Sequence, residues 1–290
     1  MQQASAAAAA GLLADHTIIL TRSYRSTKEI LDLAACVNRG DPESAVHAIF
    51  GKDEDAAAML DERPGIGPVE EWLGRHYSKA RLAPMNALRG VDPGALDNPD
   101  HPDHKEVLAG LSQAFEILDD SRILTLSHLG ARGRLAINAL AEKLLHPGSG
   151  TKFFHGEQVI LGENLHGLDL YNGDTGIILE TKNRGLQVVF RRGKRYVSHA
   201  LDRLSGIEPA FAMTVHKSQG SEFDAVLLVL PEAASPLLTR QIIYTGLTRA
   251  KLKVRILGSR AILEQAIATR DERPGGIELG PEAGSLRHEV

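Results

Sequence analysis

Two segments hold the side chains best suited to phosphate chemistry. Residues 214–224 carry hydroxyl, imidazole, ammonium and carboxylate groups around Gly220, and a continuous apolar run follows at 225–230. Because glycine has no side chain, a phosphate can approach its backbone closely. Residues 244–251 include Arg249, whose guanidinium offers planar, permanently charged donors to phosphoryl oxygens. Both segments need a rigid framework, which the surrounding sequence predicts.

The predicted framework is a parallel α/β sheet. The apolar run at 225–230 is typical of a strand in a sheet covered on both faces, and an amphipathic helix leads to Arg249. A short β-branched run at 17–20 precedes a helical pattern at 27–38. Further strand and helix patterns follow at 122–126, after Gly133, at 253–257 and at 260–269. Residues 40–120 are mostly helical with interruptions, which predicts a helical insertion or linker.

Residues 150–205 change character and predict a small all-β module. Turn signals separate its short β-type runs, and Asn172-Gly173 is the clearest, since Asn-Gly adopts positive φ at low cost. The length fits a five-stranded SH3-like barrel. The module concentrates six basic residues, Lys182, Arg184, Arg191, Arg192, Lys194 and Arg195. They could track nucleic-acid phosphates or belong to an ordinary solvated hairpin, and the sequence favours the two equally.

Composition narrows the class of protein. With 290 residues, 43% hydrophobic content and a formal net charge of -4, the chain can bury a sizeable core, and any nucleic-acid contact must come from a local patch. Cys36 is the single cysteine, which excludes an intramolecular disulfide.

The first residues have neither a basic start nor a long apolar stretch, which predicts a cytoplasmic protein. His101 and His104 lie in a proline-rich loop, and we assign no metal.

Six short blocks occur in a fixed order: Ser23-Tyr-Arg25, Asn38-Arg-Gly-Asp41, Tyr171-Asn-Gly-Asp-Thr-Gly176, Met213-Thr-Val-His-Lys-Ser-Gln-Gly-Ser-Glu-Phe-Asp224, Tyr244-Thr-Gly-Leu-Thr-Arg-Ala250 and Ile267-Ala-Thr-Arg270. This order resembles the RecD family, the alpha subunit of exodeoxyribonuclease V and a superfamily 1B DNA helicase. The resemblance implies a RecA-like, P-loop-NTPase-type parallel sheet (helicase domain 2A), a helical insertion and an inserted SH3-like β-barrel (2B). The implied bounds are 1–38, 122–147 and 206–270 for domain 2A, 39–121 for the insertion, 150–205 for the barrel and 271–290 for a tail.

Such helicases need a phosphate-binding G-x-x-x-x-G-K-[ST] loop, and this pattern is missing from the sequence. The nearest imitation is at 148–152, where Thr151 separates the glycine from Lys152. No predicted strand ends in a plausible Mg²⁺-binding carboxylate, because Glu232 follows Pro231 and the pair at 119–120 ends a helical segment. We therefore expect the C-terminal half of a motor, inactive on its own.

The resemblance also implies roles for individual residues. Arg25 and Arg249 would be two arginine fingers that reach the γ-phosphate of ATP. Tyr24 would stack on the adenine, Gly220 would approach a phosphate, and Glu222 would accept a hydrogen bond from the ribose. The expected contacts with nucleic acid come from Thr214, His216, Lys217, Arg191, Arg192 and Lys194.

In function, the resemblance implies an ATP-dependent, 5′ to 3′ DNA helicase of recombination and repair. ATP and Mg²⁺ would be shared with the missing N-terminal RecA-like domain, and the partners would be single-stranded DNA, that missing half, and RecB- and RecC-like subunits. The alternative is a non-catalytic nucleic-acid-binding or regulatory module derived from such a helicase. An upstream open reading frame that ends in a Walker A domain would favour the motor half. Its absence, together with salt-sensitive DNA binding and no ATP effect, would favour the module.

Overall fold

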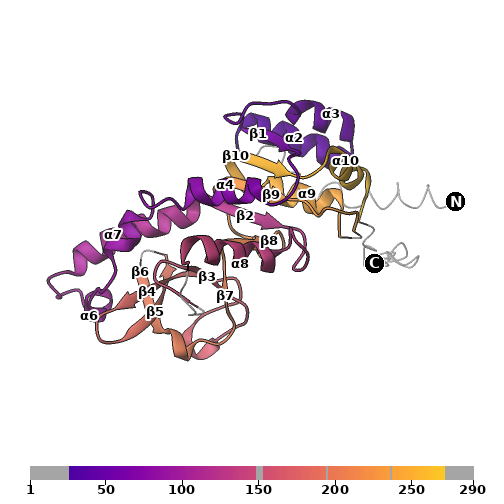
Figure 1. Ribbon diagram of the computed structural model, residues 1–290. Helices are drawn as coiled ribbons and strands as arrows, with labels where there is room; N and C mark the ends of the chain where they lie inside the picture. The colour runs from indigo at the N-terminus through magenta and orange to yellow at the C-terminus, as the bar shows by residue number, and fades with distance from the viewer. Residues whose placement is uncertain (1–25, 148–152, 194, 236, 272–290) are drawn as a thin grey trace, which may run out of the picture. The chain divides into compact units, whose positions relative to one another are not determined.

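Five parallel strands form the larger sheet, sheet A, in the computed structural model, which describes residues 26–147, 153–193, 195–235 and 237–271 (Figure 1). The strand order is β1-β10-β9-β2-β8, with β1 at Ala58–Asp61, β2 at Ser121–Thr125, β8 at Ala212–Thr214, β9 at Phe223–Val229 and β10 at Ala250–Leu257. All four ladders are parallel, which confirms the predicted α/β class. The strand predicted at 17–20 and the loop at 148–152 lie outside the described residues, as does the tail after 271.

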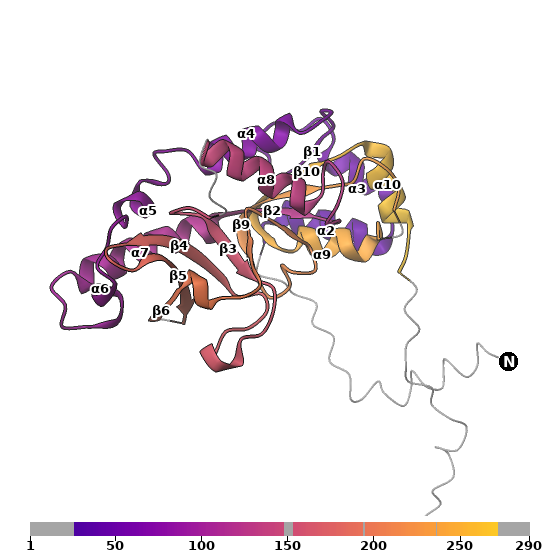
Figure 2. The ribbon, with the colours of Figure 1, turned by 60° about the horizontal axis from the view of Figure 1, so that its bottom comes forward.

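Helices cover both faces of sheet A, as the apolar run at 225–230 predicts. Along β9, Val226 and Leu228 join the core beneath α2 (Lys28–Arg39), α3 (Pro42–Ile49), α9 (Arg240–Leu247) and α10 (Arg260–Ala268). Leu227 and Val229 face the opposite core, beneath α4 (Gly67–His76) and α8 (Arg134–Leu145) (Figure 2). This alternation follows because successive side chains of a strand point to opposite faces. None of the helices in the described ranges is long and apolar enough to cross a membrane.

The range 39–121, predicted to be a helical insertion, also contributes a strand to sheet A. β1 pairs in parallel with β10 and forms one edge of the sheet. The other elements of the range are helices: α3, α4, α5 (Ala83–Ala87), α6 (Pro93–Asp97) and α7 (His104–Asp120). The helical prediction is therefore wrong for β1. Its Ala, Met and Leu are good helix formers, but pairing with β10 decides the conformation of so short a segment.

Five antiparallel strands form the second sheet, sheet B, in the order β6-β5-β4-β3-β7. Their bounds are Gln158–Leu161 for β3, Thr175–Thr181 for β4, Gly185–Arg192 for β5, Arg195–Ala200 for β6 and Ile207–Pro209 for β7. The all-β character predicted for this part is confirmed, but closure into an SH3-like barrel is not shown. Among the described residues, no ladder joins the edge strands β6 and β7. β7 lies just beyond the predicted limit at 205.

Sheet B is covered on both sides, so it buries its apolar side chains without closing on itself. Leu111 and Phe115 of α7, together with α5 and α6, pack against Ile177 and Val189 on one face. The opposite face buries a second core around Phe190, which includes side chains of the loops after β3 and β6. The helices α5 to α7, which precede β2 of sheet A in the chain, thus cover one face of sheet B.

The predicted Asn-Gly turn forms, but within a longer connection. The backbone N–H of Asp174 donates to the carbonyl of Tyr171 at 3.0 Å, and Gly173 has a φ of 96°. This positive φ is the conformation that favours glycine. The turn belongs to the 162–174 connection between β3 and β4, which also contains a short 3₁₀ helix at His166–Leu168.

Arg122 joins the two sheets. This β2 side chain is 1% exposed and donates to Gln158 Oε1 at 2.8 Å, to the Leu118 carbonyl at 3.1 Å and to the Ala210 carbonyl. Its guanidinium also lies 4.9 Å from the centre of the Phe223 ring. Burial lowers the pKa of Arg122 from its ordinary value, because desolvation penalises the charged form. Neutral acceptors on α7, on β3 of sheet B and between β7 and β8 stabilise the charge, so Arg122 links β2 with sheet B.

Candidate functional site

Arg249 is held by backbone carbonyls at the end of α9. Its Nε donates to the Thr245 carbonyl at 3.2 Å, and its Nη1 donates to the Ser221 carbonyl at 3.2 Å. The Arg249 carbonyl in turn accepts from the N–H of Phe223 at 2.8 Å. Within the described part of the chain, no carboxylate lies in ion-pair contact with this guanidinium. Two backbone carbonyls therefore fix the direction of this side chain, and no described carboxylate neutralises it.

Gly220 and Glu222 lie in the same loop as Ser221. Gly220 is exposed with a φ of +87°, and a Cβ built there would meet no atom within 4 Å, so the backbone conformation requires glycine while the space around it stays open. Glu222 is half-buried. The hydrogen bond from Lys251 to Asp224, at 2.9 Å, raises the pKa of Lys251, and the charge of Glu222 adds a smaller effect. Lys251 is thus paired with Asp224, and the charge of Glu222 acts on the same ammonium group.

The start of α2 is anchored beside Arg249. Ser26 donates through Oγ to the Ala250 carbonyl at 2.7 Å, and the N–H of Thr27 donates to the Lys251 carbonyl at 2.9 Å. The residues that follow position 25 are therefore fixed next to those that follow position 249. Tyr24 and Arg25 themselves lie outside the described residues.

Thr214 and His216 lie at the other end of the strands. Thr214 ends β8 and is in register with Thr125, which is itself in register with Val229 at the end of β9. Arg249 and Glu222 precede the first residues of β10 and β9. β9 has 7 residues, each with a rise of about 3.3 Å, so the 215–222 loop runs roughly 20 Å from the carboxyl-terminal ends of the strands to their amino-terminal ends. Thr214 is buried and His216 is exposed.

Lys217 takes part in an ion-pair network with β7. Its Nζ lies 2.7 Å from Glu208 Oε2, which also lies 3.2 Å from Arg134 Nη1. The Nε of Arg134 donates to His128 Nδ1 at 3.2 Å. Burial by itself would raise the pKa of Glu208, but the hydrogen bond from Lys217 and the charge of Arg134 outweigh it and lower that pKa. The sequence pattern does not single out Glu208 or Arg134, because these two residues are 74 positions apart and meet only in the folded chain.

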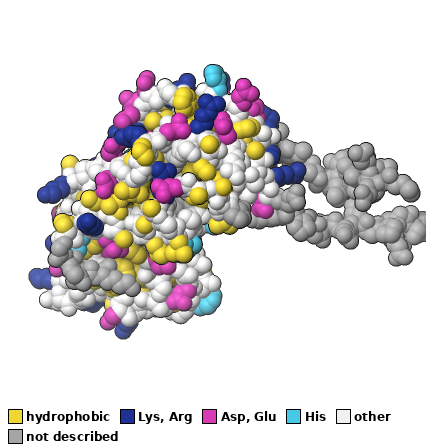
Figure 3. Space-filling view, turned by 45° about the vertical axis from the view of Figure 1, so that its right-hand side comes forward, with side chains coloured by type: hydrophobic (Ala, Val, Ile, Leu, Met, Phe, Trp, Pro, Cys, Tyr) yellow, Lys and Arg dark blue, Asp and Glu magenta, His cyan; other side chains and the backbone are white. Residues whose placement is uncertain are grey.

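The two described basic residues of the expected nucleic-acid patch on β5 are already paired. Arg191 Nη2 lies 2.7 Å from Asp119 Oδ2 of α7, and its guanidinium lies 5.3 Å from the Phe115 ring centre. Arg192 bonds to both carboxylate oxygens of Asp174. Lys194 lies outside the described residues. Figure 3 shows one face on which basic and acidic side chains are interspersed. The pairing matches the solvated-hairpin interpretation better than a free basic stripe.

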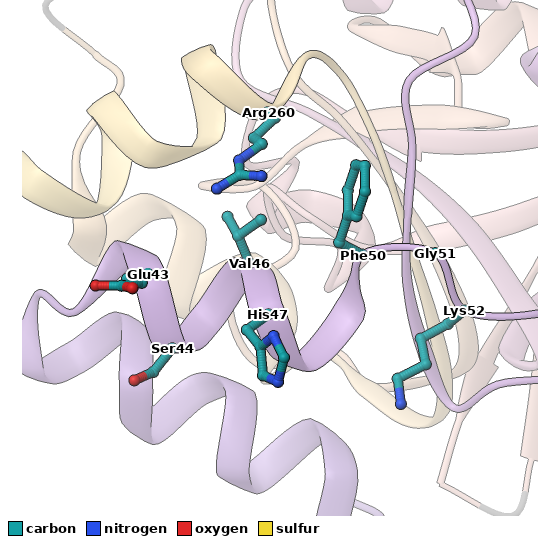
Figure 4. A pocket seen from close by; sticks show the side chains of 8 residues that line it. All are labelled: Glu43, Ser44, Val46, His47, Phe50, Gly51, Lys52 and Arg260. Atoms are coloured by element: carbon teal, nitrogen blue, oxygen red, sulfur yellow. The ribbon is translucent and has the colours of Figure 1, made fainter.

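A separate hollow lies between α3 and α10 (Figure 4). It has a volume of about 810 Å³ and is lined by Glu43, Ser44, Val46, His47, Phe50, Gly51, Lys52 and Arg260. Arg260 lies over the Phe50 ring at 5.7 Å. No residue singled out by the sequence lines this hollow, so it is separate from the candidate site.

Comparison with known proteins finds relatives of this chain. A family model described as UvrD-like helicase C-terminal domain matches residues 209–257, which contain the 215–222 loop and Arg249. The chain is 33% identical over 264 residues to the RecBCD enzyme subunit RecD of Mycobacterium tuberculosis and 36% identical over 264 residues to that of Haemophilus influenzae. These alignments cover 90% and 89% of this chain, but 42% and 40% of the relatives.

The chain thus spans about two fifths of the length of these relatives. Among solved structures, a Bacteroides Pif1 helicase in complex with ADP-AlF3 and ssDNA has 14% identity and a TM-score of 0.45, covering 88% of this chain and 54% of that one. That score is too low to support an assignment, which rests on the sequence relatives. Over about nine tenths of its own length the chain is therefore a homologue of part of the RecD subunit of the RecBCD enzyme, and residues 209–257 match the UvrD-like helicase C-terminal domain.

Proposed function

We propose that this chain is the C-terminal motor part of a RecD-like, ATP-dependent 5′ to 3′ DNA helicase that acts in recombination and repair in the cytoplasm. The observation that carries the proposal is the environment of the Arg249 guanidinium. Carbonyls of Thr245 and Ser221 fix its direction, while no described carboxylate neutralises it. A fixed, uncompensated guanidinium is suited to phosphoryl oxygens that gain charge in the transition state.

The residues around Arg249 fit a nucleotide. The open backbone at Gly220 can meet a phosphate, and the Glu222 carboxylate can accept a hydrogen bond from a ribose hydroxyl. Anchoring of Ser26 on Ala250 supports Arg25 as a second finger and Tyr24 as the adenine contact. When bound, ATP with Mg²⁺ supplies the phosphoryl group and its counter-charge. Because the sequence lacks a G-x-x-x-x-G-K-[ST] loop, another polypeptide segment provides the phosphate cradle in this proposal.

The proposed contact with single-stranded DNA lies at the carboxyl-terminal ends of the strands of sheet A, away from Arg249. The Thr214 hydroxyl and the exposed His216 imidazole position the strand without reading its sequence. The 215–222 loop connects this end of the strands with Glu222 and Arg249. A shift of the loop on nucleotide binding would therefore move the DNA contact and the nucleotide contact together. Arg191 and Arg192 of β5 would add phosphate contacts only after exchange of the carboxylates that pair with them, and Lys194 is a third proposed contact. RecB- and RecC-like subunits are the proposed further partners.

The DNA contact can be tested by fluorescence anisotropy with labelled single-stranded DNA. We expect His216→Ala to weaken binding by about tenfold, the effect of one lost hydrogen bond to a charged group. His47→Ala is the matched control, because His47 is also exposed but lines the hollow between α3 and α10. If both variants bind DNA as the wild type does, the proposed DNA contact of His216 is wrong.

A further inference from the structure

Glu208 sits where sheet B meets the 215–222 loop. It belongs to the edge strand β7, and its two carboxylate oxygens contact cations from two other elements. Arg134, the first residue of α8, donates Nη2 to Oε1 at 3.3 Å, and its Nη1 lies 3.2 Å from Oε2. Lys217 Nζ lies 2.7 Å from the same Oε2. One carboxylate therefore connects sheet B, α8 and the loop.

The two cations differ in how freely they can leave Glu208. The Arg134 side chain is 5% exposed, and its Nε is used by His128, so loss of Glu208 would leave a buried charge poorly compensated. The Lys217 side chain is 23% exposed, and an ion pair with that access to water is weak enough for another anion to compete. Arg134 thus fixes the carboxylate, and the carboxylate in turn holds the lysine.

We propose that Glu208 is a positioning residue that keeps Lys217 away from the nucleic-acid backbone, so that sheet B sets how many phosphates the 215–222 loop contacts. The inference rests on the proposed DNA contact of this loop. Lys217 lies one residue after His216 in that loop, where a released ammonium would add one phosphate contact. The free chain therefore binds single strands through one cation fewer than its sequence suggests.

The test is the salt dependence of single-stranded DNA binding by Glu208→Gln. Each phosphate neutralised on a single strand contributes about -0.7 to the slope of log K against log salt, so we expect the variant to bind more tightly with a slope steeper by about 0.7. Its advantage over the wild type should grow about 2.6-fold when salt falls from about 200 mM to about 50 mM. In the double variant E208Q/K217M, this gain should be lost.

Glu180→Gln is the matched control. Glu180 lies on β4 of the same sheet and pairs with Arg89, so this change removes the same charge without releasing Lys217. An unchanged slope in Glu180→Gln and a steeper slope in Glu208→Gln support the inference. Weaker binding by Glu208→Gln, or a gain that persists in E208Q/K217M, overturns it. If neither the wild type nor Glu208→Gln binds DNA, the proposed function itself fails, and the inference with it.

A second measurement needs no variant. In the DNA-free wild-type chain, acylation of the Lys217 amine, followed by mass spectrometry, should be about threefold slower than that of the exposed Lys182, because the ion pair protects it. Equal rates for the two lysines would show that Glu208 does not hold Lys217, which overturns the inference.

Discussion

Glu157 carries a buried carboxyl group whose replacement by glutamine should stabilise the protein at high pH. The residue is 0% exposed and precedes β3. Its Oε2 accepts from the N–H of Phe154 at 3.1 Å, while Oε1 has no hydrogen-bond partner among the described residues. Burial, with a smaller effect of Glu142, raises the pKa of Glu157 to about 8. The folded protein therefore keeps this carboxyl neutral near pH 7.

The direction in which pH changes the free energy of unfolding follows from the pKa of Glu157 in the folded and in the unfolded chain. The ordinary pKa of 4.5 applies to the unfolded chain, so below pH 4.5 both states are protonated and the group costs nothing. As pH rises from 4.5 towards 8, the unfolded state releases its proton first, and the free energy of unfolding falls. At about 1.4 kcal/mol per pKa unit, the loss above pH 8 is at most about 5 kcal/mol. Local relaxation reduces it, and we expect roughly 1 to 3 kcal/mol.

Urea unfolding followed by the fluorescence of Trp72 can measure this difference. We expect Glu157→Gln to be more stable than the wild type at about pH 9 and nearly equal at about pH 5, since the amide stays neutral at both. Glu116→Gln, an exposed change on α7, is the control and should show no such pH-dependent difference. A Glu157→Gln variant that gains nothing between the two pH values would refute the reasoning.

A second prediction concerns the contacts by which Arg122 links the two sheets. Arg122→Ala should lower the free energy of unfolding by about 3 kcal/mol, because it leaves a cavity and removes the donor of the Ala210 and Leu118 carbonyls. Arg122→Met fills most of the volume, and we expect it to cost roughly 1 kcal/mol less in the same urea experiment, since a buried charge without a carboxylate partner gains little from its charge. If Arg122→Met is the less stable of the two, the charge rather than the packing stabilises this link.

Much of sheet A could be predicted because its signals are local. The apolar run at 225–230 and the amphipathic helix at 240–247 carry their periodicity in consecutive residues, and both elements form where the sequence places them. β1 and β7 were missed for the opposite reason. Each has only three or four residues, and each becomes a strand by pairing with a neighbour, β10 or β3, that lies far away in the sequence.

For the candidate site, too, some features could be predicted from the sequence and others depend on tertiary contacts. The resemblance to helicase motifs predicts that Gly220, Glu222 and Arg249 share one site. In the structure, Arg249 donates to the carbonyl of Ser221, which lies between the other two residues in the chain. The sequence shows that basic residues are concentrated near β5, but it does not reveal the carboxylates that pair with Arg191 and Arg192. Asp119, the partner of Arg191, is 72 residues away on α7. Which charges remain free depends on tertiary contacts, and these are not encoded in spacing.

The most direct test is ATP turnover in the presence of single-stranded DNA. The chain should show negligible turnover alone and gain it when a polypeptide that carries a G-x-x-x-x-G-K-[ST] loop, such as the remaining part of a RecD relative, is added. Arg249→Ala should then lower the rate by about 10³- to 10⁵-fold, as loss of an arginine finger does. Robust turnover by the chain alone, or an Arg249→Ala variant as active as the wild type in the mixture, would contradict the account.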